Sequence, residues 1–95
     1  MKSLAIKMDN EKLVRISLEK EGEKIKTINI SGDFFIHPES GISLLEDALD
    51  GIKIEKGHLK EALDREVMDN HLELIGISTD TIVHGILEVS KEYEK

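Results

Sequence analysis

The sequence predicts an α+β fold of two layers, in which a three-stranded antiparallel meander is followed by about three helices packed on one face of the sheet. Two observations lead to this prediction. Up to residue 30, apolar residues tend to alternate with polar ones, which is the period of half-buried strands, whereas beyond residue 40 they recur about every 3.6 residues, as in helices. The links between the expected strands are also short, which favours antiparallel neighbours.

Three segments have the pattern of strands. In residues 4–8, large apolar side chains alternate with Ala5 and Lys7, and residues 14–19 alternate between apolar and polar side chains. Residues 24–30 return after a short turn at Gly22. Because consecutive strands with short links usually pair, we expect the first strand at an edge of the sheet. In the third strand Ile28 and Ile30 share a face, which Phe34 continues by parity.

Three later segments have the pattern of helices. Residues 42–49 form the first, with Ser40 as its N-cap and Gly51 just past its end. Residues 59–67 form the second, and the third follows Ser78, which is expected to cap it. Residues 72–77 are apolar but too short to assign from periodicity alone.

Length and composition fit one domain spanning residues 1–95, with 39% hydrophobic and 35% charged residues. The absence of cysteine excludes disulfides, thiolate metal sites and thiol catalysis. A net charge of -7, from 20 acidic and 13 basic side chains, disfavours a nucleic-acid partner. No apolar run approaches the ~20 residues that span a bilayer, and the N-terminus lacks the pattern of a signal peptide. We therefore expect a cytoplasmic protein with no membrane partner.

Patterns typical of catalysis or of ligand binding are scarce. The sequence has no Gly-x-Ser-x-Gly elbow and no glycine-rich phosphate loop. His58 and Glu61, or His84 and Glu88, lie one helical turn apart and could share a metal ion, but no third ligand is fixed by spacing. Exposed polar residues on helices are the simpler interpretation. We expect no catalytic, cofactor-binding or metal-ligating residue in this chain alone.

The stretch Ser31-Gly32-Asp33-Phe34-Phe35 contains two of the three aromatic residues, and the only proline, Pro38, follows shortly after. Gly32 permits a bend at the end of a strand, and Asp33 is a short hydrogen-bond acceptor beside it. The simplest interpretation is a strand-to-helix corner whose two rings fill the core. His37 precedes the proline and is restricted to extended conformations. It either closes the corner or donates a hydrogen bond to a partner.

The same residues resemble the signature of the C-terminal accessory domain of lipoate–protein ligases. In that family Gly-Asp-Phe-Phe is typically followed by a helix reading Leu-Glu-x-x-Leu-x-Gly, and later by Gly-Ile before a final helix. The matching residues here are Leu45, Glu46, Leu49 and Gly51, and then Gly76 and Ile77. The resemblance implies an α+β fold akin to that of iron–sulfur scaffold and sulfur-acceptor proteins (SufE/NifU-like), in agreement with the pattern of strands and helices.

The resemblance also implies a function. In that family ATP, Mg and lipoate bind to a larger catalytic domain, and the C-terminal domain assists the formation of lipoyl-AMP; in some members the two parts are separate chains. Because the sequence begins at a methionine and ends just after the last expected helix, it resembles the small accessory subunit of such a heterodimer. We would then expect a catalytic ligase subunit as partner, lipoyl acceptor domains as indirect partners, and no catalytic activity from this chain alone. The candidate interface residues are Gly32, Asp33, Phe34, Phe35 and His37.

Two alternatives to this interpretation are a lipoyl acceptor domain and a free-standing adaptor module. A lipoyl acceptor domain presents its modified lysine in an Asp-Lys turn, and the sequence contains no Asp-Lys pair. A free-standing interaction or adaptor module on the same scaffold-like fold, unrelated to lipoate, stays open. The identity of the neighbouring gene would separate the adaptor from the ligase subunit.

Overall fold

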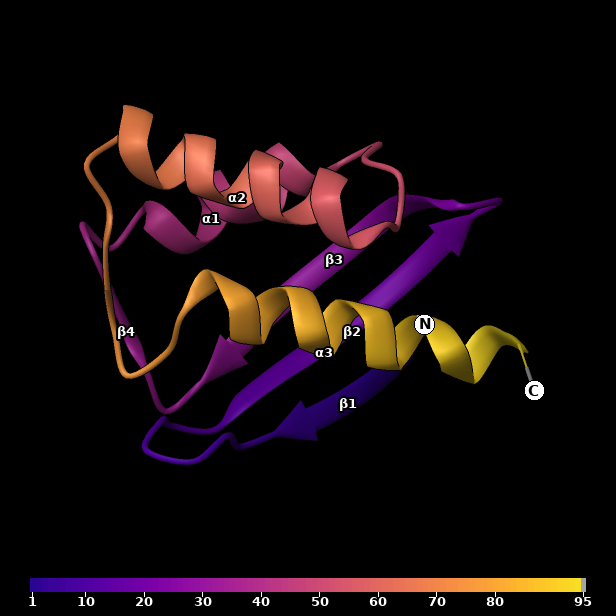
Figure 1. The fold of residues 1–95 in the computed structure, drawn as a ribbon, viewed down its shortest axis with the longest axis horizontal. Helices are drawn as coiled ribbons and strands as arrows, with labels where there is room; N and C mark the ends of the chain where they lie inside the picture. Colours follow the sequence, from indigo (N-terminus) through magenta and orange to yellow (C-terminus); the bar gives the residue numbers. More distant parts are fainter. Residues whose placement is uncertain (95) are drawn as a thin grey trace.

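The computed structural model describes residues 1–94 and has the predicted α+β fold (Figure 1). An antiparallel sheet of order β1-β2-β3 comes first, from β1 (Lys2–Ile6), β2 (Val14–Glu21) and β3 (Lys24–Gly32). The elements that follow are β4 (Phe35–His37), α1 (Gly41–Leu49), α2 (Lys56–Asp69), β5 (Glu73–Ile75), α3 (Thr79–Lys91) and a short 3₁₀ helix, η1 (Glu92–Glu94). Three strands followed by three helices were predicted, and β1 lies at an edge as expected.

The central strand β2 supplies the middle of the core. Its apolar residues Val14, Ile16 and Leu18 are all buried, whereas the residues between them face the open side of the sheet. Ile16 lies opposite Leu4 of β1 and Ile30 of β3, so the same face is apolar across the sheet. This alternation is why the sheet is covered on one face only.

The three helices cover that apolar face (Figure 1). Helix α3 contacts β1 and β2, α1 contacts β3, and α2 packs against both α1 and α3. Each helix contributes fully buried side chains, among them Leu45 and Leu49, Leu59 and Leu63, and Ile82, Ile86 and Val89. No helix within residues 1–94 is long and apolar enough to cross a membrane.

The helix ends follow the predicted chemistry with one exception. Ser78 caps α3 by accepting a hydrogen bond from the Thr81 N–H at 3.2 Å, and Gly51 has the expected left-handed backbone with φ +77°. Ser40 stands at the N-cap position of α1, but its side chain makes no capping hydrogen bond. Its backbone is already helical, with φ -68° and ψ -8°, whereas a capping side chain normally projects from an extended residue.

A second, two-stranded sheet was not predicted. Strands β4 and β5 pair antiparallel, so that the segment after the third strand lies beside the segment that precedes α3. Each strand has only three residues, and about 40 residues separate them in the sequence. No local sequence pattern therefore predicts that they pair. This ribbon connects the main sheet to the helical layer.

Strand β3 is the other edge of the main sheet, and the chain covers much of it. Near its start, the Ile25 N–H donates to the Ile52 carbonyl at 3.0 Å and the Gly51 N–H donates to the Ile25 carbonyl at 2.9 Å. Near its end, the Ile30 N–H donates to the Glu46 carboxylate of α1 at 2.7 Å. Pairing these groups leaves less of the edge open to another strand.

Candidate functional site

The candidate site begins where the chain leaves the main sheet at Gly32. This residue has φ +152°, and a Cβ built there would lie 2.2 Å from the carbonyl oxygen of Leu13. Backbone atoms cannot move aside as a flexible side chain can, so a larger residue does not fit. The N–H of Asp33 donates to the same Leu13 carbonyl at 3.0 Å, which fixes the start of the next segment.

Phe34 and Phe35 point in opposite directions. Phe34 is 6% exposed and lies in the core, on the side that parity with Ile28 and Ile30 predicted. Phe35 is 71% exposed. The expectation that both rings fill the core is therefore correct for Phe34 and wrong for Phe35. The reason is the extended backbone, in which successive side chains project to opposite sides.

The exposed Phe35 is one of four side chains on the outer face of the β4–β5 ribbon. In β4, Phe35 and His37 are exposed and Ile36 is buried; in β5, Glu73 and Ile75 are exposed and the residue between them is half-buried. Phe35 lies opposite Ile75, and His37 lies opposite Glu73. We call these four residues the ribbon face. Sequence analysis named Phe35 and His37 and missed Glu73 and Ile75, because residues 72–77 had no assignable period.

The ribbon is held in place from both of its strands. The N–H of Lys12 donates to the carbonyl of Gly76, just past β5, at 2.7 Å. Gly76 has φ +94°, and a Cβ there would lie 2.7 Å from the Lys12 side chain. Gly41, at the start of α1, allows close approach of Ile36 beneath β4, where a Cβ would meet the Ile36 side chain at 2.2 Å. These contacts attach both strands of the ribbon to the rest of the fold.

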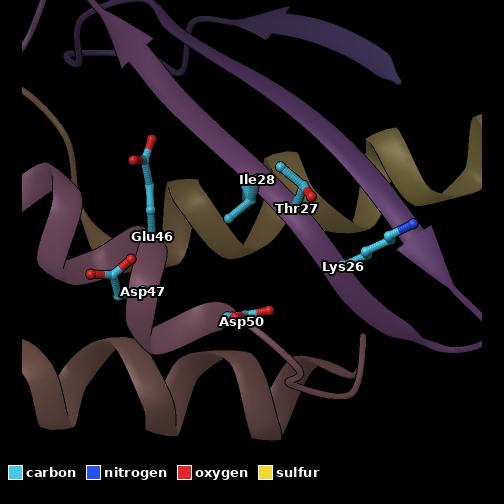
Figure 2. Close-up of a pocket in the computed structure, with 6 residues that line it drawn as sticks. All are labelled: Lys26, Thr27, Ile28, Glu46, Asp47 and Asp50. Carbon is cyan, nitrogen blue, oxygen red and sulfur yellow. The ribbon is translucent and has the colours of Figure 1, made fainter.

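A shallow hollow between β3 and α1 is a second candidate site, lined by Lys26, Thr27, Ile28, Glu46, Asp47 and Asp50. Figure 2 shows the three carboxylates pointing in different directions, so they do not converge on one point. The Glu46 carboxylate already accepts the Ile30 N–H. The hollow therefore lacks the convergent ligands that a metal or a phosphate requires.

The two pairs considered for a metal are not supported by the geometry. The His58 Nδ1 lies 3.0 Å from Glu55, and Glu61 instead pairs with Arg65 at 2.6 Å. In the part of the chain that the structure describes, no group of three or more histidines and carboxylates is placed to hold a metal ion. In the second pair, Glu88 instead pairs with Lys91 at 3.1 Å, and His84 is exposed on α3.

A polar cluster joins α2 to the start of α3. Lys60 donates to the Thr79 hydroxyl at 2.7 Å and lies 3.1 Å from Asp64 and 3.2 Å from Asp80, while Thr79 donates to Asp64 at 2.7 Å. Partial desolvation acts to raise the pKa of Asp64, but hydrogen bonds from Thr79 and Lys60 and the Lys60 charge outweigh it, so the pKa is lowered. Partial desolvation acts to lower the pKa of Lys60, but Asp64 and Asp80 raise it overall. These hydrogen bonds and ion pairs tie α2 to the start of α3.

Comparisons with known proteins agree with this architecture. The chain is similar to a chain in the solved structures of an archaeal lipoylation system, a bi-partite lipoate protein ligase and its E2 lipoyl domain from Thermoplasma acidophilum. The TM-score is 0.73 with 29% identity, and the match covers 88% of this chain and 96% of that chain. It is also 54% identical over 44 residues to lipoate-protein ligase A subunit 2 of the same organism. That match spans 46% of this chain and only 47% of the relative's length.

The family match includes two of the three strands of the main sheet, β2 and β3, and the whole ribbon. Residues 13–86 match the family described as the bacterial lipoate protein ligase C-terminus, from the residue before β2 to the middle of α3. All of β4 and β5 therefore lies within the matched range, including the Gly-Asp-Phe-Phe signature. This chain belongs to the family of bacterial lipoate protein ligase C-terminal domains.

Proposed function

We propose that this chain is the accessory subunit of a two-chain lipoate–protein ligase and that a separate catalytic subunit is its partner. The observation that carries the proposal is the similarity of fold, over nearly the whole of both chains, to a chain from a bi-partite ligase system. The partial match to a ligase subunit 2 supports the same assignment. Family membership favours this function over an adaptor unrelated to lipoate.

The step that the subunit assists is, in this proposal, the activation of lipoate. The lipoate carboxylate attacks the α-phosphorus of ATP, lipoyl-AMP forms and pyrophosphate leaves. ATP, Mg²⁺ and lipoate would bind to the catalytic subunit, which would then transfer the lipoyl group to a lysine of an acceptor domain. Because the reaction consumes ATP, we place the complex in the cytoplasm.

An accessory subunit can raise a rate without contributing a catalytic group. It can complete the walls of the partner's active site, exclude water, or hold a loop in its productive position. Lipoyl-AMP is a mixed anhydride that water hydrolyses, so exclusion of water would protect the product of the first step. Transfer from lipoyl-AMP already bound in the catalytic subunit would need no such help.

The five residues predicted for the partner interface divide into two groups in this proposal. Phe35 and His37 belong to the ribbon face and would contact the catalytic subunit. Gly32, Asp33 and Phe34 would act indirectly, because the backbone bend and the buried ring hold that face in position.

The experiment separates the two half-reactions. The catalytic subunit from the same genome is supplied with ATP and lipoate, with and without this chain, and lipoyl-AMP is measured by mass spectrometry. Transfer to an acceptor lipoyl domain is then measured from synthetic lipoyl-AMP, again with and without this chain. A third reaction contains this chain alone with ATP and lipoate.

We expect lipoyl-AMP formation to depend on this chain and transfer from preformed lipoyl-AMP to proceed without it. The chain alone should form no lipoyl-AMP. Equal stimulation of both steps would contradict the assignment to activation. If this chain stimulates neither step and does not bind the catalytic subunit, the adaptor interpretation would be favoured instead.

A further inference from the structure

The ribbon face has an apolar centre that the fold leaves uncovered. Phe35 and Ile75, 71% and 49% exposed, lie directly opposite each other on paired strands, so their side chains are neighbours. The other large apolar side chains that are exposed on the described residues are Met1, Met8 and Met68. Met68 sits in the last turn of α2, outside the two paired strands. An exposed phenylalanine beside an exposed isoleucine is the kind of cluster that anchors protein interfaces.

The two strands that carry the apolar pair are also held by contacts with the rest of the fold. Phe34 is buried just before β4, and Gly41 lets α1 approach the inner side of β4. The Lys12 N–H binds the end of β5 to the loop between β1 and β2. A surface that is already ordered loses little conformational entropy when a partner binds. The family signature therefore supplies both the buried support and the exposed anchor.

The surroundings of the apolar pair are acidic. The segments that build the ribbon, residues 33–39 and 69–76, contain no lysine or arginine, and their carboxylates are Asp33, Glu39, Asp69 and Glu73. Lys12 of the neighbouring loop adds one positive charge, which leaves the balance negative. The whole chain carries -7. A second copy of this chain, an anionic membrane surface and a nucleic acid would all be repelled.

We infer that the ribbon face docks into an apolar pocket bordered by lysine and arginine side chains on the catalytic subunit, with Phe35 and Ile75 as its central anchors. This inference rests on the proposed function and adds the surface and the chemistry of the partner. Burial of Phe35 and Ile75 supplies affinity, while Glu73 and the neighbouring carboxylates guide association with a cationic rim. His37, opposite Glu73, lies at the polar end of the same face.

The test compares binding of the catalytic subunit by wild-type and variant chains in titration calorimetry. Phe35→Thr and Ile75→Thr remove the apolar pair and keep residues that favour strands. Met68→Gln is the matched control, because Met68 is 74% exposed on α2 and glutamine favours helices. Glu73→Gln removes a rim charge, and Asp47→Asn removes a charge from the exposed side of α1 as its control. Thermal melts establish that each variant is folded.

We expect Phe35→Thr to weaken binding about 30-fold, equivalent to about 2 kcal/mol, and Ile75→Thr about tenfold. Met68→Gln and Asp47→Asn should bind like the wild type, and Glu73→Gln should lower the association rate and its dependence on salt. In the wild type, hydrogen exchange at residues 35–37 and 73–75 should slow when the catalytic subunit is added. This measurement needs no variant and so does not depend on how a variant folds.

Three results would overturn the inference. Wild-type affinity in both threonine variants, with no protection of the ribbon amides, would place the docking surface elsewhere and leave the proposed function intact. Self-association that Phe35→Thr abolishes would make a second copy the occupant. A wild-type chain that does not bind the catalytic subunit would reject the proposed function and this inference with it.

Discussion

Phe34 and Phe35 show how adjacent residues of one type divide two tasks. The bend at Gly32 sets the chain into an extended path, and the extended path sends one ring into the core and the next outward. The alternation that begins at Ile28 was enough to predict the inward direction of Phe34. The exposure of Phe35 was not predicted, because in a chain with few aromatic residues both rings were expected to be needed for the core.

The two phenylalanines should respond differently to truncation. Phe34→Ala should lower the free energy of unfolding by roughly 3–5 kcal/mol, through lost burial and the cavity left behind. Phe35→Ala should lower it by less than about 1 kcal/mol, because the ring is already mostly in water. Denaturant unfolding of both variants measures the difference. Similar losses in the two variants would mean that Phe35 is packed more closely than its exposure indicates.

At the scale of elements, the longer strands and the helices were predictable and the short ribbon was not. Strand β2 and helix α3 bury side chains at regular intervals over eight and thirteen residues, so their periods are visible in the sequence. Strands β4 and β5 have three residues each and depend on a partner about 40 residues away. The half of the ribbon face that came from β5 therefore could not be found by periodicity.

The edge of β3 yields a prediction about Glu46, a residue of the family's helix signature. Glu46→Ala removes the acceptor of the Ile30 N–H and should cost about 1–2 kcal/mol of unfolding free energy. Glu46→Gln keeps an acceptor oxygen and should cost less. The neighbouring Asp47 is exposed, so Asp47→Ala serves as the control.

Unfolding curves and the hydrogen-exchange rate of the Ile30 amide test this role of Glu46. The exchange rate should rise in Glu46→Ala and stay unchanged in Asp47→Ala. An equal loss of stability in the two alanine variants would indicate that the loss comes from α1 in general and not from this hydrogen bond.

At the scale of the whole molecule, α2 is held in the helical layer by α1 and α3, against which it packs. Leu59 and Leu63 bury its inner side, and the cluster of Lys60, Asp64 and Thr79 ties it to the start of α3. The pKa of Asp64 is lowered in the folded chain. This carboxyl therefore adds stability at pH values above its ordinary pKa of 3.8, and that stability is lost as the pH falls through the folded pKa. The pKa of Lys60 is raised in the folded chain. Its contribution to stability is therefore complete at pH values below its ordinary pKa of 10.5 and is lost as the pH rises through the folded pKa.

The charges of this cluster should contribute to the pH dependence of the free energy of unfolding. At neutral pH Asp64→Asn should reduce the free energy of unfolding by less than about 1 kcal/mol, because both charged partners are partly exposed to water. The difference from the wild type should shrink as the pH falls below 3.8. Denaturant unfolding at a series of pH values measures it, and a difference that is unchanged in acid would assign the effect to packing instead of charge.

In the proposed function, this chain docks on a catalytic ligase subunit and enables activation of lipoate. The most direct measurement is the rate of lipoyl-AMP formation by a fixed amount of that subunit as this chain is titrated in, for the wild type and for Phe35→Thr. The rate should rise to a plateau with the wild type. The variant should reach the same plateau at about 30-fold higher concentration, because only the affinity has changed. A rate that does not respond to saturating wild-type chain would contradict the claim.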